Sequence, residues 1–124
     1  MVLKTKSILA ATSIDDGLRI CVMREYNPGK HPEYMPIDEH WDALPPSKEL
    51  LKDYHNNLPW EDYVKRFTSE VLLNQAEKVK ELANKAMKDD ITILCYEDKP
   101  DKCHRRLVAL ACQMYEPYLK LVLE

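Results

Sequence analysis

Four short segments have the residue pattern of β-strands. Residues 7–13 (SILAATS) and 18–24 (LRICVMR) lie near the N-terminus, separated by an Asp-Asp-Gly turn, and the second alternates strongly apolar residues with others. Residues 91–96 (ITILCY) form a short apolar, β-branched run, which is typical of a strand buried on both faces of a parallel sheet. Residues 119–124 (LKLVLE) alternate apolar and charged side chains, which favours an edge strand over a loosely docked tail.

Helical periodicity fills most of the remaining second half of the chain. Residues 47–57 (SKELLKDYHNN) predict a helix that Ser47 caps and two asparagines end. Residues 103–115 (CHRRLVALACQMY) predict another, ended by Pro117. A longer pattern begins near Pro59, and its apolar stripe steps by one residue at Val71 and Leu72. Unbroken, that helix would be about 40 Å long, so we expect a bend at residues 72–74.

Between the second strand and the first helix lies a long loop. Residues 25–46 contain five prolines and one glycine, so regular structure is not expected across most of the segment. Loops of this length in small domains serve either as functional lids or as flexible excursions. The aromatic residues Tyr26, Tyr34 and Trp41 indicate that this loop packs down, and a lid would place at least one of them near Cys103.

The order of these elements predicts the fold class. Strands separated by helices, with a strand-loop-helix unit near the end, favour a small α/β protein with a mostly parallel sheet flanked by helices. A chain of 124 residues is near the commonest size of one domain, so we expect residues 1–124 to form a single domain.

Composition narrows the classes of function. The chain is 45% hydrophobic and 31% charged, which indicates a globular protein. Its formal net charge is −3, so no basic surplus is available to hold a nucleic acid. No segment has the length of a membrane span or the apolar core of a signal peptide, and the four cysteines are too scattered for a disulfide-stapled secreted fold. We therefore expect a cytosolic protein with no membrane or nucleic-acid partner, in an oligomeric state that the sequence leaves open.

Candidate chemistry gathers at the carboxyl end of the apolar strand. Cys95 ends that strand, while Cys103, His104 and Arg105 open the following helix. Ligands of open α/β sheets collect outside the carboxyl ends of strands, and a helix start favours anions there. With Asp101 as the N-cap, Cys103 would lie in the first turn, where the helix dipole and its cationic neighbours would stabilise a thiolate.

Other site types fit less well. Zinc is disfavoured because the cysteine spacing matches no structural zinc pattern and because adjacent Cys103 and His104 would point in different directions on a helix. Neither the C-x5-R loop of cysteine phosphatases nor a glycine-rich phosphate loop occurs in the sequence. We therefore predict no cofactor, and the cysteine spacing predicts no metal. Cys21 and Cys112 lie within regular elements and are interpreted as core residues. A purely structural role for the whole cluster also stays open.

One family resemblance covers nearly the whole chain. The stretch LCYEDKPDKCHRRLVALA resembles the C-terminal signature of the domain-of-unknown-function-488 family, a Cys-x-Glu strand end followed by a Cys-His-Arg helix start. Upstream, DDGLRICVMREYNPG, HWDALPPSKELLKDYHNN and PWEDYVKRFTSEV are similar to one branch of that family. The resemblance implies an α/β fold and, besides the residues named above, adds Arg24 and Glu97 to the site. The segment ILAATS replaces a glycine-containing first strand found in many relatives.

Two hypotheses of function follow. In the first, the protein is a cysteine-dependent enzyme acting on a small anionic substrate, with Cys103 or Cys95 as the reactive thiol and His104 as a proton carrier. Arg24 and Arg105 would hold the anion, while Glu97 would act as base or order an arginine. In the second, the protein is a non-catalytic binding or interaction module, and the same residues form a buried network that locks the last helix to the sheet.

Overall fold

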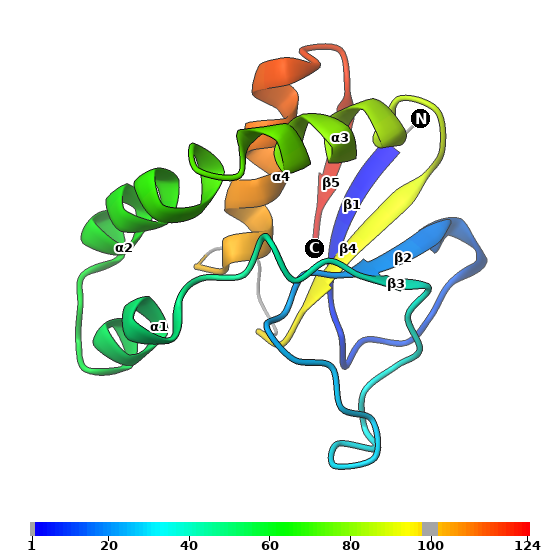
Figure 1. The fold of residues 1–124 in the computed structure, drawn as a ribbon. Coiled ribbons are helices and arrows are strands. Elements are labelled where there is room, and N and C mark those ends of the chain that lie inside the picture. The colour runs from blue at the N-terminus through cyan, green and yellow to red at the C-terminus, as the bar shows by residue number, and fades with distance from the viewer. Residues whose placement is uncertain (1, 98–101) are drawn as a thin grey trace.

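The chain folds around a five-stranded parallel sheet (Figure 1). The computed structural model describes residues 2–97 and 102–124. The strands, in the spatial order β3-β2-β4-β1-β5, are β1 (Val2–Ser7), β2 (Leu18–Cys21), β3 (Glu39–His40), β4 (Ile91–Cys95) and β5 (Lys120–Leu123). The predicted α/β class is confirmed, and β4 is the central strand.

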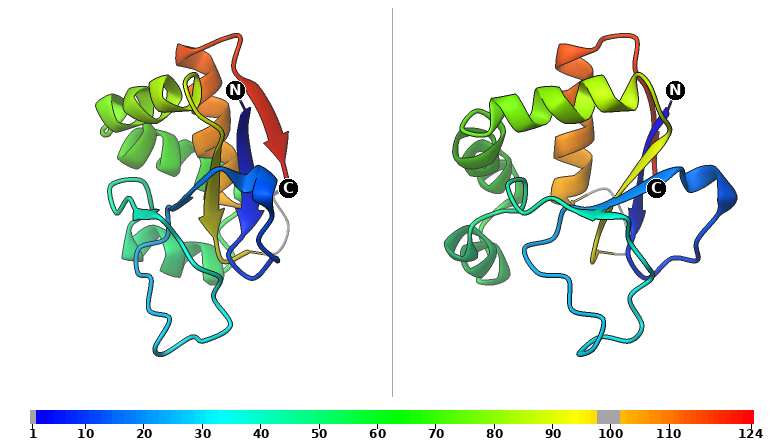
Figure 2. Two further views of the ribbon diagram at one scale, coloured as in Figure 1. Left: turned by 90° about the vertical axis from the view of Figure 1, so that its right-hand side faces the viewer. Right: turned by 45° about the vertical axis from the view of Figure 1, so that its right-hand side comes forward.

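Helices cover one face of this sheet. They are α1 (Lys48–His55), α2 (Trp60–Phe67), α3 (Ala76–Ala86) and α4 (His104–Tyr115), and a π-helical segment η2 (Thr68–Leu72) follows α2. A 3-10 turn η1 (Ile14–Asp16) precedes β2 and lies at the other face of the sheet. The views in Figure 2 show α3 and α4 crossing the same face, with α1 and α2 farther out. The β4–α4 unit therefore brings the end of the central strand and the start of the last helix to one edge of the sheet.

Strand register fixes which side chains face the helices. Thr5, Ile93 and Ile20 are direct neighbours across three strands, and all three are buried. One pleat further along, Ser7 pairs with Cys95, so both point to the same face as the core residues. Cys95 is thus the last inward-facing residue of β4, at the carboxyl edge.

The opposite face of the sheet carries a buried ionic cluster centred on Asp16. Its carboxylate pairs with Lys6 at 3.0 Å and with Arg19, and its carbonyl accepts from the Thr92 hydroxyl at 2.7 Å. Burial alone would raise the pKa of Asp16, but hydrogen bonds with the Ser13 backbone, Lys6 and Arg19 outweigh it and lower the pKa. This cluster ties η1 to the sheet.

The first two strands differ from the sequence prediction. The first strand spans Val2–Ser7 instead of residues 7–13, and its buried positions alternate with partly exposed ones that include Lys4 and Lys6. Because lysine and threonine are common in this strand, the segment lacks a strong apolar signal, yet β4 and β5 pair with it on both sides. The second strand ends at Cys21, three residues earlier than predicted.

The helical predictions agree closely with the structure. Ser47 accepts a hydrogen bond from the Leu50 amide, and Asn56 ends α1. The predicted bend at residues 72–74 lies where η2 ends and the chain turns before α3. A π-helical segment inserts one extra residue per turn, which explains why the apolar stripe steps at Val71 and Leu72. Lys120–Leu123 is the predicted edge strand.

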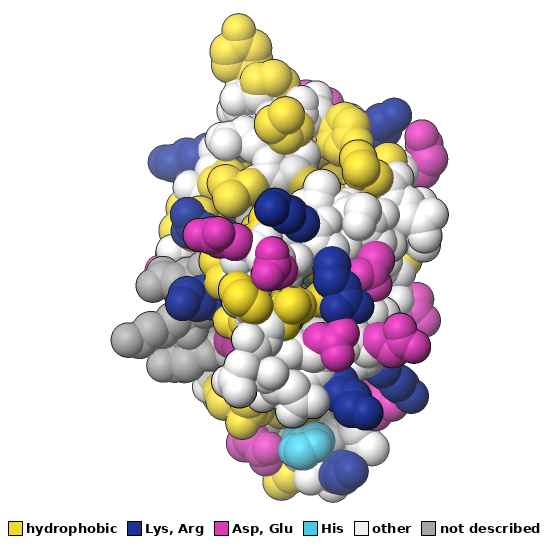
Figure 3. All heavy atoms as spheres, turned by 90° about the vertical axis from the view of Figure 1, so that its left-hand side faces the viewer, with side chains coloured by type: hydrophobic (Ala, Val, Ile, Leu, Met, Phe, Trp, Pro, Cys, Tyr) yellow, Lys and Arg dark blue, Asp and Glu magenta, His cyan; other side chains and the backbone are white. Residues whose placement is uncertain are grey.

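Acidic and basic side chains are interspersed on the face that carries α1 and α2 (Figure 3). Apolar side chains also reach the surface where η2 meets the end of α4, among them Leu73, Leu110 and Met114. None of the helices in residues 2–97 and 102–124 combines the length and hydropathy that crossing a bilayer would need.

Candidate functional site

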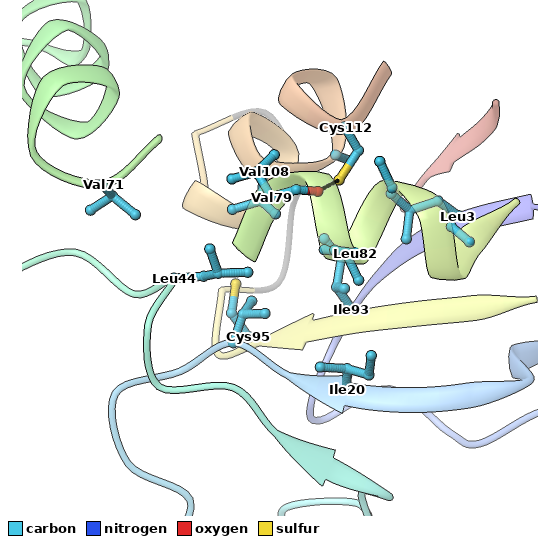
Figure 4. Packing of buried hydrophobic residues seen from close by; sticks show 14 of the residues in the cluster. Leu3, Ile20, Leu44, Val71, Val79, Leu82, Ile93, Cys95, Val108 and Cys112 are labelled. Carbon is cyan, nitrogen blue, oxygen red and sulfur yellow. Dashed lines mark hydrogen bonds between the residues drawn. The ribbon is translucent and has the colours of Figure 1, made fainter. Parts of the chain in front are cut away.

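The two site cysteines meet at the carboxyl edge of the sheet. Cys95 ends β4 beside Leu44, as Figure 4 shows, and Cys103 immediately precedes α4. Their sulfur atoms are in contact in the manner of a disulfide, whereas their Cα atoms are 7.9 Å apart. Both residues are buried, with exposed fractions of 0% and 2%. The expected convergence of the two thiols is therefore observed.

The N-cap of α4 lies two residues later than the predicted one. Cys103 is the N-cap, with extended backbone angles φ −131° and ψ 145°, instead of a residue of the first turn. Asp101, the predicted N-cap, lies outside the described residues. Since Cys103 is not helical, its side chain does not diverge from that of His104, and the helical-spacing prediction is wrong at this position. The Sγ atom of Cys103 lies 3.9 Å from His104 Nδ1.

The Glu97 carboxylate lies against both sulfurs. Its Oε2 atom is 3.3 Å from Cys95 Sγ and 3.2 Å from Cys103 Sγ. In the dithiol state either S–H group can donate to this oxygen. A half-buried acceptor is thus positioned to take a proton from either cysteine.

The imidazole of His104 is fixed by the sheet. Its Nε2 is 2.8 Å from the Val22 carbonyl, which accepts a hydrogen bond from this nitrogen, so Nδ1 carries the lone pair that faces Cys103. Burial lowers the pKa of His104 and the Arg105 charge acts in the same direction, while the Val22 hydrogen bond and Glu97 oppose the shift. We conclude that the ring is held neutral near pH 7.

Arg105 is fully buried behind the sulfurs. Its Nη1 donates to the Glu97 carbonyl at 2.6 Å and lies 3.1 and 3.3 Å from the sulfurs of Cys95 and Cys103. Its Nε and Nη2 donate to the main-chain oxygen of Glu124 after β5. The guanidinium therefore faces the thiols, where a positive charge stabilises thiolates.

A pocket of about 300 Å³ opens beside this cluster. Its walls come from the end of β2, the end of the long loop, α1, and the β4–α4 unit: Met23, Arg24, Glu25, Pro45, Pro46, Leu51, Tyr96, Glu97 and His104. Arg24 is exposed and anchored by one nitrogen, Nη2, to the Pro46 carbonyl at 2.8 Å. Glu97 and His104 thus line the pocket and also contact the Cys103 sulfur.

Comparison with protein families gives a match over most of the chain. The model of the active DUF488-N3 subclade, DUF488-N3a, matches residues 3–115. The chain belongs to the DUF488 family. No curated protein and no solved structure is detectably similar to it.

The long loop of this DUF488 chain contributes to the pocket at both of its ends. Within the loop, the Tyr34 ring packs edge-on against Tyr96 with centroids 6.4 Å apart, next to the end of β4. Trp41 lies instead beneath Lys78 of α3. The loop therefore brings Tyr34 to the end of β4, but Tyr26, Tyr34 and Trp41 are not among the residues that line the pocket, so the lid stays a prediction.

The other two cysteines are buried in the core, as predicted. Cys112 points to the Val79 carbonyl at 3.7 Å (Figure 4), and burial raises its pKa to about 12. Burial also raises the pKa of Cys21, and both residues are free thiols.

Main-chain atoms complete the DUF488 site. The Val22 carbonyl orients His104, and the Glu124 oxygen holds Arg105. Sequence reasoning missed both because a carbonyl group has no residue-type signal. The pairing of β2 with β4 is the one signal that could have placed the Val22 carbonyl at the site, because Val22 follows the Cys21–Leu94 pair by one residue.

Proposed function

We propose that this DUF488 protein is a cysteine-dependent enzyme that acts on a small anionic substrate. The observation that carries the proposal is the placement of Glu97 and His104, which contact the Cys103 sulfur and also line a pocket that has Arg24 in its wall. A thiol, a proton acceptor and a cationic anchor for an anion thus lie within one unit. The family model's description as an active subclade is consistent with catalysis.

The chemistry begins with proton transfer. Glu97 Oε2, at 3.2 Å, accepts the Cys103 proton, and Arg105 Nη1, at 3.3 Å, stabilises the resulting thiolate. The thiolate attacks the electrophilic atom of the substrate, a sulfur bond forms, and the leaving group departs with the proton from Glu97. Water then cleaves the sulfur bond and returns the thiol to its starting state.

Substrate binding falls to Arg24. Its guanidinium lines the pocket, and one nitrogen is held by the Pro46 carbonyl, so its other donors are available to a carboxylate, phosphate or oxidised sulfur group. Arg105 is buried against the two sulfurs and stabilises their thiolate forms. Cys95, also in contact with Cys103 and Glu97, is the second thiol of the site.

A structural role is the second candidate function. It is favoured by the burial of Cys95, Cys103 and Arg105, whose contacts join β4, α4 and the end of β5. In that case the cluster holds α4 on the sheet, and the protein is a binding or interaction module.

An anionic alkylating agent separates the two functions. We expect iodoacetate to label the reduced site thiols with a rate that saturates with concentration, because the pocket binds its carboxylate before the sulfur displaces iodide. One charge-assisted hydrogen bond contributes about 1.5–3 kcal/mol, so Arg24→Ala should slow labelling about 10- to 100-fold. Labelling by neutral iodoacetamide should change little.

The matched control is Arg66→Ala, since Arg66 pairs with Asp53 and Glu70 on the helical surface and does not line the pocket. It should leave both rates unchanged. An iodoacetate rate that is linear in concentration and insensitive to Arg24→Ala would contradict the enzyme proposal and favour the structural role.

A further inference from the structure

Four metal-ligating side chains converge at the thiol site. Cys95, Glu97, Cys103 and His104 each offer one ligand atom, and these atoms all lie within 4.8 Å of one another. Two sulfurs, one imidazole nitrogen and one carboxylate oxygen form a donor set that suits a tetrahedral Zn²⁺-type ion.

The distance between the Cα atoms of the two cysteines also favours a bound metal ion. Their Cα atoms are 7.9 Å apart, beyond the range of about 4.4–6.8 Å that disulfides span. Two thiolates on one tetrahedral zinc, at about 2.3 Å each, have sulfurs about 3.8 Å apart. A modest rotation of the two side chains away from each other would therefore admit an ion between them.

The surrounding contacts match those of metal sites. The Val22 carbonyl accepts from His104 Nε2 and leaves Nδ1 facing the Cys103 sulfur, which is the way metal-binding histidines are commonly oriented. Arg105 Nη1 lies 3.1 and 3.3 Å from the sulfurs of Cys95 and Cys103, so it would donate to the metal-bound thiolates. Ligands and their supporting groups are thus both present.

Charge balance also favours a divalent cation. Two thiolates and the Glu97 carboxylate carry three negative charges in a largely buried space, and Arg105 supplies one positive charge. A divalent ion supplies two more. A divalent cation therefore offsets much of the negative charge that the three anionic ligands bring together.

We infer that the reduced protein binds one thiophilic divalent ion of the Zn²⁺ class through Cys95, Glu97, Cys103 and His104. This inference rests on the same residues as the proposed function and specifies a ligand for them. A bound metal ion would coordinate both sulfurs, so neither cysteine would act as a nucleophile in the metal-loaded form.

Cobalt is the spectroscopic probe for this site. Anaerobic titration of the reduced full chain with Co²⁺ should produce thiolate-to-cobalt charge transfer and the visible bands of tetrahedral cobalt, saturating at one ion per chain. Zn²⁺ should displace the cobalt. Cys103→Ala should remove the signal, whereas the matched variant Cys21→Ala, which replaces a buried thiol outside the cluster, should retain it.

A second measurement tests the metal site without any variant, in case Cys103→Ala does not fold. In the wild-type protein, Zn²⁺ should protect Cys95 and Cys103 from iodoacetamide while leaving the slow labelling of Cys21 and Cys112 unchanged. No cobalt signal in the wild type, a signal that survives Cys103→Ala, or no protection by Zn²⁺ would each overturn the inference.

The two proposals fail independently. Cobalt binding without the Arg24-dependent iodoacetate labelling of the metal-free protein would overturn the enzyme proposal and support the metal site. Arg24-dependent labelling without cobalt binding would overturn the metal site and support the enzyme.

Discussion

Replacing Arg105 by alanine tests whether this guanidinium holds the site together from within. Its side chain is fully buried and donates to two main-chain oxygens, those of Glu97 at 2.6 Å and Glu124 at 3.1 Å, besides contacting both sulfurs. Each charge-assisted hydrogen bond contributes about 1.5–3 kcal/mol, and its loss leaves an acceptor unsatisfied. Arg105→Ala should therefore lower the free energy of unfolding by about 3 to 5 kcal/mol.

Urea denaturation of the reduced protein, followed by circular dichroism, measures this change. Arg106→Ala is the control, because Arg106 is the next residue of α4 and is only partly buried, and a loss below about 1 kcal/mol is expected there. Equal small losses for both variants would refute the reasoning, since they would mean that the contacts of Arg105 contribute little.

Further predictions concern the backbone and the ionic cluster on the other face of the sheet. Gly17 has φ +63°, and a Cβ there would overlap the carbonyl that precedes β4. Gly17→Ala should lower the melting temperature and lose at least about 2 kcal/mol, whereas Gly29→Ala, where a Cβ meets ordinary contacts, should be nearly neutral in the same thermal melts. Hydrogen bonds from the Ser13 backbone, Lys6 and Arg19 lower the pKa of Asp16, so the stability that this carboxylate contributes is present above the unfolded pKa of about 4 and disappears as the pH falls through the folded value. Asp16→Asn should lower the free energy of unfolding by about 3 to 5 kcal/mol at pH 7 and make stability less dependent on pH on the acid side. If the variant and the wild-type protein have the same dependence of stability on pH, this prediction is wrong.

The parts of the fold that could be predicted are those with local signals. The apolar run of β4 and the helical period of α4 are visible in the sequence, and parallel topology alone then places Cys95 near Cys103. The bend at η2 was foreseeable because the π-helical segment shifts the apolar stripe by one residue. The first strand was not, because Lys4 and Lys6 alternate with its buried positions.

The finer geometry of the site depended on contacts that leave no trace in residue types. A shift of two residues in the N-cap position made Cys103 the N-cap and brought its sulfur close to His104, against the expectation from helical spacing. The partners of Arg105 include main-chain oxygens from segments far apart in the chain. An anion was expected beside Arg105; the partners of Arg105 among the described residues include both site sulfurs and the main-chain oxygens of Glu97 and Glu124, and the external anion stays a prediction.

The most direct test of the central claim is the labelling rate of each cysteine in the reduced, metal-free protein. Limited iodoacetamide treatment near pH 7, with peptide mass spectrometry, reports the four sites separately. With its pKa raised to about 12, Cys112 is a thiolate in only about one molecule in 10⁵ at pH 7, and Cys21 is likewise suppressed by burial. The account predicts that Cys103 or Cys95 is modified well before Cys21 and Cys112. Equally slow modification of all four would contradict a reactive thiol site.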